Sequence, residues 1–264
     1  MEKNAAYWDE ILEKTQYDTF WVSKDGHIVD RPELMYIHSK RDIQYLNTVL
    51  RVRGGEQELP VLIKEVENAH KGVRSRWLLS PNNQSQILEN LLEEAGYTPG
   101  YTHHGYVMPV ELYQSKTNPA YEARRVQTFQ EIADFEEVTL SAFPHASKLS
   151  KEELERELLA CTKKNARVIR HVVYDKETGK PISSGGLNIY PELEFGFLWA
   201  GATAPEYRGK RAYSTLMAQR FVFAKEMDLR ALGLYAREGT SAPIVEAQGF
   251  LKCGKMLQWE RAAT

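Results

Sequence analysis

Hydrophobic positions recur in a similar way in the two halves of the chain. Residues 91–97 (LLEEAGY) and 244–250 (IVEAQGF) both have the apolar spacing of a short amphipathic helix. Each segment reaches a glycine, which can adopt the left-handed conformation that closes a helix, and an aromatic residue then starts a strand. The two segments therefore predict an internal repeat.

The elements before these two segments follow one order, which is a strand, a long helix and a second strand. They are predicted at residues 45–53, 60–70 and 76–79 in the first half, and at 195–203, 210–227 and 231–236 in the second half. The shared order supports the repeat, although its period is far too long for a solenoid.

The region between the two copies is predicted to hold a linker and the start of a second domain. A strand-like segment at 105–113 is followed by the polar residues 114–125, which show no apolar period. Two helices and a hairpin come next, at 127–143, at 151–161 with Ser150 as N-cap, and at 167–174 with 181–190. This order predicts an α+β fold with a mixed sheet, divided into domains at 1–113 and 126–264 by the linker 114–125.

The composition narrows the class of protein. The 264 residues are 42% hydrophobic and 27% charged with a formal net charge of −2, a globular balance without the basic excess of a nucleic-acid binder. No apolar run reaches the roughly 18 residues of a membrane helix, and the acidic amino terminus is unlike a targeting peptide. Cys161 and Cys253 are too few to build a zinc site. We therefore expect a soluble, cytoplasmic protein with no metal and no nucleic-acid or membrane partner.

The strongest chemical signal lies around the start of the helix at 210–227. Residues 207–220 contain no acid and four cations, which are Arg208, Lys210, Arg211 and Arg220. Cations at a helix N-terminus oppose the helix dipole, and a bound anion held by the free N–H groups of the first turn would resolve the conflict. A solvated basic helix start accounts for the charges equally well.

The sequence Tyr207-Arg208-Gly209-Lys210, between a strand and a helix, resembles motif A of the GNAT superfamily, the acyl-CoA-dependent N-acetyltransferases. Residues 122–259 resemble the whole family domain in length and element order. The family's loop reads Arg/Gln-x-x-Gly-x-Gly/Ala, which Arg208 fits, whereas Arg211 and Tyr213 stand where small residues are usual. None of these residues is proline, so their backbone N–H groups remain. With the repeat, the resemblance implies two GNAT-like lobes in tandem, each a mixed sheet flanked by helices, the first of them degenerate.

The resemblance also implies that acetyl-CoA is the acyl donor and that no metal takes part. The pyrophosphate would be held by the loop and first helical turn, which are Arg208, Gly209, Lys210, Arg211, Ala212, Tyr213 and Ser214. Backbone groups of Gly201, Ala202 and Thr203 would meet the pantetheine amides, since small residues allow a close approach. Ser241 would lie by the thiol end, or serve only as the N-cap of the short helix.

The residues for acyl transfer are less evident. Many relatives carry a tyrosine acid five residues before the closing aromatic, where this chain has Val245. A thiolate, with a thiol pKa of about 8.5, can leave without an acid. For the general base, Glu192 and Glu194 lie at the mouth of a strand that often supplies a carboxylate in relatives, and we favour Glu194. The alternative for Glu194 is a solvated carboxylate at a hairpin end.

The first lobe has its own counterpart of the phosphate loop at residues 51–60. Arg53 is the cation near the predicted helix start, and Glu56 and Glu58 follow it. Two carboxylates would repel a pyrophosphate. We therefore expect that this lobe does not bind CoA, and that it either shapes the acceptor pocket or stabilises the other lobe.

These features predict an N-acetyltransferase that moves an acetyl group from acetyl-CoA to the amine of a small molecule, such as an amino acid, an amine metabolite or an antibiotic. One alternative is a CoA-binding or partner-binding module without chemistry, which the absence of a tyrosine at position 245 suggests. A second is a Fem-type transferase that takes aminoacyl-tRNA, although the net charge of −2 offers little for tRNA.

Overall fold

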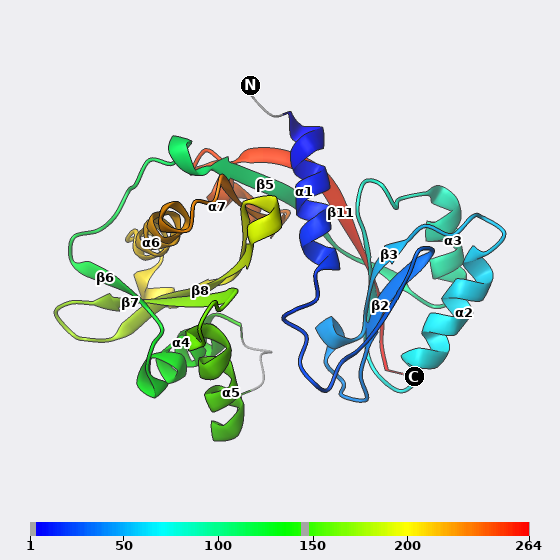
Figure 1. The fold of residues 1–264 in the computed structure, drawn as a ribbon, viewed down its shortest axis with the longest axis horizontal. Coiled ribbons are helices and arrows are strands. Elements are labelled where there is room, and N and C mark those ends of the chain that lie inside the picture. Colours follow the sequence, from blue (N-terminus) through cyan, green and yellow to red (C-terminus); the bar gives the residue numbers. More distant parts are fainter. Residues whose placement is uncertain (1–3, 144–147, 264) are drawn as a thin grey trace. The chain divides into compact units, whose positions relative to one another are not determined.

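A computed structural model describes residues 4–143 and 148–263 of the chain (Figure 1). It divides into two compact units, one formed by Met1–Val107 with Tyr235–Thr264 and the other by Met108–Leu234. The division falls within two strands, β5 (Thr98–Pro109) and β10 (Ala231–Arg237). No helix in the described ranges is long and apolar enough to cross a membrane.

The first unit contains a mixed sheet in the order β1, β2, β3, β4, β11, β5. The strands besides β5 are β1 (His27–Arg31), β2 (Leu34–His38), β3 (Thr48–Val52), β4 (Ser75–Leu79) and β11 (Leu251–Arg261). β3 and β4 are parallel, and the other neighbours are antiparallel. The helices are α1 (Ala5–Tyr17), α2 (Leu59–Ala69), α3 (Gln86–Glu94) and the short α7 (Ala242–Glu246).

Both faces of this sheet are covered because apolar side chains alternate along its strands. Leu34 and Tyr36 of β2 pack in one core with the apolar sides of α2 and α3. Met35 and Ile37 point to the other face, where Tyr17 at the end of α1 joins their core. Figure 1 shows α1 on one side of β2 and β3 and α2 and α3 on the other.

The second unit contains a mixed sheet in the order β10, β9, β8, β7, β6. Its strands besides β10 are β6 (Tyr121–Arg125), β7 (Val168–Asp175), β8 (Pro181–Tyr190) and β9 (Phe195–Thr203), and only the β9–β10 pair among them is parallel. Val172 packs with α4 (Phe129–Ala142) and α5 (Lys151–Thr162), whereas Val173 packs with α6 (Ala212–Glu226). The helices thus cover opposite faces, as Figure 1 shows.

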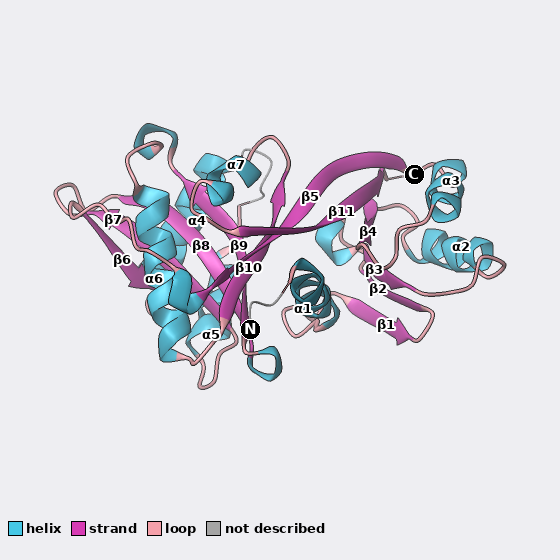
Figure 2. Cartoon of the chain, turned by 90° about the horizontal axis from the view of Figure 1, so that it is seen from above, coloured by secondary structure: helices cyan, strands magenta, loops and turns pink. Residues whose placement is uncertain are grey.

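The structure confirms the predicted repeat at its two closing glycines. Gly96 and Gly249 both have left-handed backbones, with φ angles of 79° and 85°, after α3 and α7. The strands that follow them, β5 and β11, pair antiparallel and run side by side (Figure 2). Ser150 caps α5 as predicted, and its partner in a reciprocal capping box is Glu153.

Several elements differ from the prediction. The segment 45–53 begins as a 3-10 turn, Gln44–Leu46, because the amide of Asn47 bonds the carbonyls of Arg41 and Ile43 and closes the loop before β3. The last five residues of the predicted linker 114–125 form β6, which pairs with β7. The compact units also have other boundaries than the predicted domains. β11 lies between β4 and β5, so the C-terminal segment belongs to the first unit.

Gly186 in β8 is expected to be essential for stability because a β-carbon there would overlap the ring of Trp199 in β9. That ring cannot easily move, since its Nε1 donates to Asn188 Oδ1 at 2.8 Å. Gly186→Ala should therefore lower the free energy of unfolding by about 1–3 kcal/mol, the usual cost of overpacking. Urea denaturation measures this loss, and a Trp199→Leu background should recover part of it. An unchanged midpoint of urea unfolding in Gly186→Ala would contradict the close contact between position 186 and the Trp199 ring.

Candidate functional site

The loop between β9 and α6 presents a row of free backbone N–H groups. Gly209 and Arg211 have left-handed backbones, with φ angles of 73° and 67°, so the chain turns twice before the helix. The N–H groups of Gly209, Arg211, Ala212, Tyr213 and Ser214 have no acceptor within residues 4–143 and 148–263. Unpaired N–H groups at the positive end of a helix dipole form an anion-binding site.

The side chains around this loop are cationic and are not neutralised by carboxylates in the described part of the chain. Arg208, Lys210 and Arg211 are exposed, and none forms an ion pair with a carboxylate in the described part of the chain. The Nε of Arg208 donates to the carbonyl of Thr203 at 3.3 Å, which ties the loop to the end of β9. The Lys210 ammonium lies 5.6 Å from the centre of the Tyr207 ring. The three cations and the free N–H groups therefore lie at the same loop, where both favour an anion.

The preceding strand has backbone groups that its sheet does not use. β9 pairs with β8 over its whole length, but its parallel pairing with β10 is confined to Phe195–Phe197. The later residues include a bulge, where Ala200 has a φ of 46° and the register with β8 shifts. Gly201 is exposed next to the bulge. An extended ligand with amide groups could pair with this free edge as an added strand does.

Tyr213 in the first turn of α6 explains the glycine at position 201. An ideal β-carbon on Gly201 would lie 2.8 Å from Cε2 of the Tyr213 ring, so only glycine fits without a shift. Ala202 is buried, whereas Thr203 is half-buried and shares a hydroxyl contact of 3.0 Å with Ser183. The structure thus brings Gly201, Thr203 and the loop together at one end of β9.

Glu194 lies at the other end of β9. It follows the 3-10 turn Pro191–Leu193 and has a left-handed backbone with a φ of 48°. Its exposed carboxylate forms an ion pair with Arg230, which precedes β10. Glu192 is also exposed, within the turn. The predicted base therefore opens the strand whose far end carries the anion loop.

Ser241 and Val245 belong to the first unit. Ser241 occupies the N-cap position of α7 but forms no side-chain cap, because its backbone is already helical, with φ −82° and ψ −25°. Its Oγ accepts the N–H of Arg237 at 2.8 Å instead. Ser241 is therefore the N-cap of α7 by position, as predicted, but its side chain does not bond the first turn. Val245 is fully buried, so its position offers no acid.

The first unit's counterpart of the anion loop is already occupied by its own carboxylate. Glu58, at the N-cap of α2, accepts the N–H of Gly55 at 2.8 Å. The Arg53 guanidinium lies 5.8 Å from the centre of the Tyr17 ring. A glutamate thus takes an N–H group that an anion would need.

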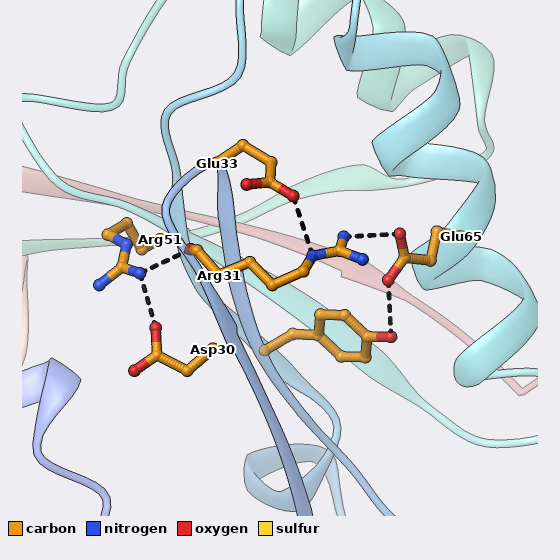
Figure 3. Close-up of polar contacts among 6 residues, drawn as sticks. Asp30, Arg31, Glu33, Arg51 and Glu65 are labelled. Atoms are coloured by element: carbon orange, nitrogen blue, oxygen red, sulfur yellow. Dashed lines mark hydrogen bonds and ion pairs between the residues drawn. The ribbon is translucent and has the colours of Figure 1, made fainter.

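Nearby cations in the first unit are paired as well (Figure 3). Arg51 contacts Asp30 at 2.7 Å, and Arg31 contacts Glu65 at 2.7 Å and Glu33 at 2.9 Å. Ion pairs of this kind leave little net positive charge for a ligand. The two copies of the repeat therefore differ in their capacity for an anion.

Arg220 is the cation that the sequence placed wrongly. The count of cations groups it with the helix start, but it lies in the third turn of α6 and is only 1% exposed. Its neighbours Leu216 and Ala224, one turn away on either side, are also buried, and this helical spacing is the signal that could have shown its burial. No group of three potential metal ligands lies together among the residues that the structure describes.

Comparison with known proteins finds a family model that matches part of the chain. Residues 130–254 match the model of the acetyltransferase (GNAT) family. A GCN5-related N-acetyltransferase from Kribbella flavida is similar in fold, with a TM-score of 0.72, 12% identity, and coverage of 96% of this chain and 96% of that one. No curated protein matches the sequence.

Two further solved structures share the fold. A GCN5-related N-acetyltransferase from Sphaerobacter thermophilus has a TM-score of 0.64 at 14% identity, covering 98% of this chain and 93% of its own. A tandem GNAT protein from the clavulanic acid biosynthesis pathway has a TM-score of 0.62 at 10% identity, covering 96% and 88%. At identities of 10–14%, the similarity shows a shared fold and nothing further.

Proposed function

We propose that the chain is an N-acetyltransferase with two GNAT-like lobes in tandem, because residues 130–254 match the model of the acetyltransferase (GNAT) family. It transfers an acetyl group from acetyl-CoA to the amine of a small molecule, such as an amino acid, an amine metabolite or an antibiotic. The observation that carries this proposal is the row of free N–H groups at the start of α6, flanked by Arg208, Lys210 and Arg211.

The loop residues bind the donor in this proposal. The free N–H groups of Gly209 and of residues 211–214 hold the pyrophosphate together with the three cations, and the helix dipole also favours its charges. The free edge of β9 at Gly201, Ala202 and Thr203 pairs with the pantetheine amides. These contacts direct the thioester along β9, away from the loop.

The acyl transfer itself needs a neutral amine. Glu194 is proposed to accept the proton of the acceptor ammonium, directly or through water. The amine nitrogen then forms a bond to the thioester carbonyl carbon, the carbon–sulfur bond breaks, the sulfur leaves as a thiolate, and the nitrogen loses its second proton to water to give the amide. The thiolate leaves without an acid, which a thiol pKa of about 8.5 permits.

Two measurements test this function. Calorimetry should show that the protein binds CoA and acetyl-CoA, and an amine panel should show release of free thiol that requires both protein and amine. Absence of CoA binding at millimolar concentration would contradict the proposal. Thermal stabilisation by library amines in the presence of CoA would identify the acceptor, since a ligand at a hundredfold over its Kd stabilises by about 2.7 kcal/mol.

A CoA-binding module without chemistry is the second candidate. It is favoured by the buried Val245 and by the ion pair that engages Glu194. The two candidates share CoA binding and differ in turnover. Thiol release with any amine excludes the second candidate, whereas binding without thiol release across the panel supports it.

A further inference from the structure

Three basic side chains meet beneath α6, away from the anion loop. Arg125 of β6, His171 of β7 and Gly185 of β8 are successive register partners across the sheet. Arg220 of α6 lies over the glycine, since an ideal β-carbon there would be 3.0 Å from its Nη1. Phe223 of α6 contacts this row, with its ring centre 5.9 Å from that of His171 and 5.2 Å from the Arg125 guanidinium.

These side chains carry buried polar atoms without hydrogen-bond partners. Among the residues that the structure describes, no partner exists for Nε and Nη2 of Arg220, both ring nitrogens of His171, or Nε of Arg125. Arg220 is 1% exposed and His171 is fully buried. The Nη1 of Arg220 donates to the carbonyl of Gly186 at 3.3 Å. Buried polar groups are almost always satisfied in native proteins, so these atoms are placed to bind a further group.

A group bound at these donors is expected to bring negative charge. Neither Arg125 nor Arg220 forms an ion pair with a carboxylate in the described ranges. Burial lowers the pKa of Arg220, and this effect is partly opposed by Tyr213, whose phenol also hydrogen-bonds the Arg220 side chain, and by Tyr113. Burial raises the pKa of Tyr113 to about 12, so this phenol is neutral at pH 7. A guanidinium stays charged in proteins, and a buried charge without a counter-charge is strongly destabilising.

We propose that Arg220, His171 and Arg125 hold a small inorganic anion of the chloride class beneath α6. The anion accepts the free N–H groups of both guanidinium groups and neutralises the charge of Arg220. Burial and the two cations lower the pKa of His171 to about 3, so its neutral ring can donate one N–H to the same anion.

The site would also support β8 where it faces the bulge of β9. Arg220 holds the Gly186 carbonyl, and the register between β8 and β9 shifts between Ser184 and Gly186. An anion that fixes the guanidinium therefore stabilises this part of the sheet. The inference does not depend on acetyl transfer, because it concerns stability in the absence of CoA.

Thermal unfolding in different sodium salts tests the proposal. At equal ionic strength and pH 7.5, the melting temperature should rise by a few degrees from gluconate, which is too large for the site, to chloride, and the rise should saturate. Crystals grown in bromide should show an anomalous peak beside the Arg220 guanidinium. Equal melting temperatures in the two salts together with no bromide peak would overturn the proposal.

Substitutions separate this site from a general salt effect. Arg220→Met removes the charge at similar length and should abolish the difference between chloride and gluconate. The matched control Arg156→Met, at an exposed arginine of α5, should keep it. A chloride effect that persists in Arg220→Met would contradict the proposal. If that variant does not fold, Arg125→Met should weaken the effect, and the bromide peak in the wild-type protein remains decisive.

Discussion

Reversing the charge of Arg208 and Lys210 is expected to weaken CoA binding by more than about 100-fold, since hydrogen bonds to charged groups are each worth about 1.5–3 kcal/mol. Both side chains are exposed at the start of α6 and form no ion pair in the described part of the chain. The double variant Arg208→Glu, Lys210→Glu removes two cations and adds two anions beside the free N–H groups. Calorimetric titration with CoA measures the loss.

A matched variant controls for the change in net charge. Lys163→Glu with Lys164→Glu alters the charge equally at exposed residues after α5, and its CoA affinity should stay within about threefold of the wild type. Both double variants should keep the wild-type melting temperature within a few degrees, because the substituted side chains are exposed. Unchanged CoA affinity in the Arg208 and Lys210 variant would remove the α6 loop from the cofactor site.

Glu194→Gln is expected to lower kcat/KM by roughly 10²–10⁴ at neutral pH, the usual contribution of a general base. The substitution keeps the shape of the side chain and removes its capacity to accept a proton. The deficit should shrink as the pH rises, because the acceptor amine then loses its proton to solvent. CoA affinity should not change. Steady-state thiol release over a range of pH measures all three.

The ion pair with Arg230 supplies the control for this substitution. Arg230→Gln breaks the pair but leaves the Glu194 carboxylate in place, so kcat/KM should change by less than about threefold, as for an exposed pair. If Glu194→Gln itself has an effect below threefold, Glu194 is a surface carboxylate and another group or water removes the proton.

Much of the fold could be predicted from the sequence, because the residues that start and end its elements lie close together along the chain. The glycines that end α3 and α7 were found from their place after an amphipathic segment, and both have left-handed backbones. The N-cap Ser150 was found from the acidic residues that follow it. The prediction omitted α1, β1 and β2, although Asp25-Gly26 before β1 and Pro32 between β1 and β2 are turn signals that mark this hairpin.

The candidate site could be predicted only in part from the sequence. The surplus of cations between 207 and 220 indicated an anion site, and the loop geometry supports it for Arg208, Lys210 and Arg211. The same count included Arg220, which the structure buries under α6. A count of charges along a helix does not tell which face carries each one, whereas the register of β6, β7 and β8 beneath it does.

The sequence by itself determined where helices end, which loop is cationic and which loop is acidic, because each of these depends on residues within one or two turns. Only the tertiary structure decided that β11 enters the sheet between β4 and β5, that Glu58 takes the N–H of Gly55, and that Arg220 lies over Gly185. These outcomes depend on strand pairing and packing between distant residues, and local hydrophobic periodicity does not encode such partners.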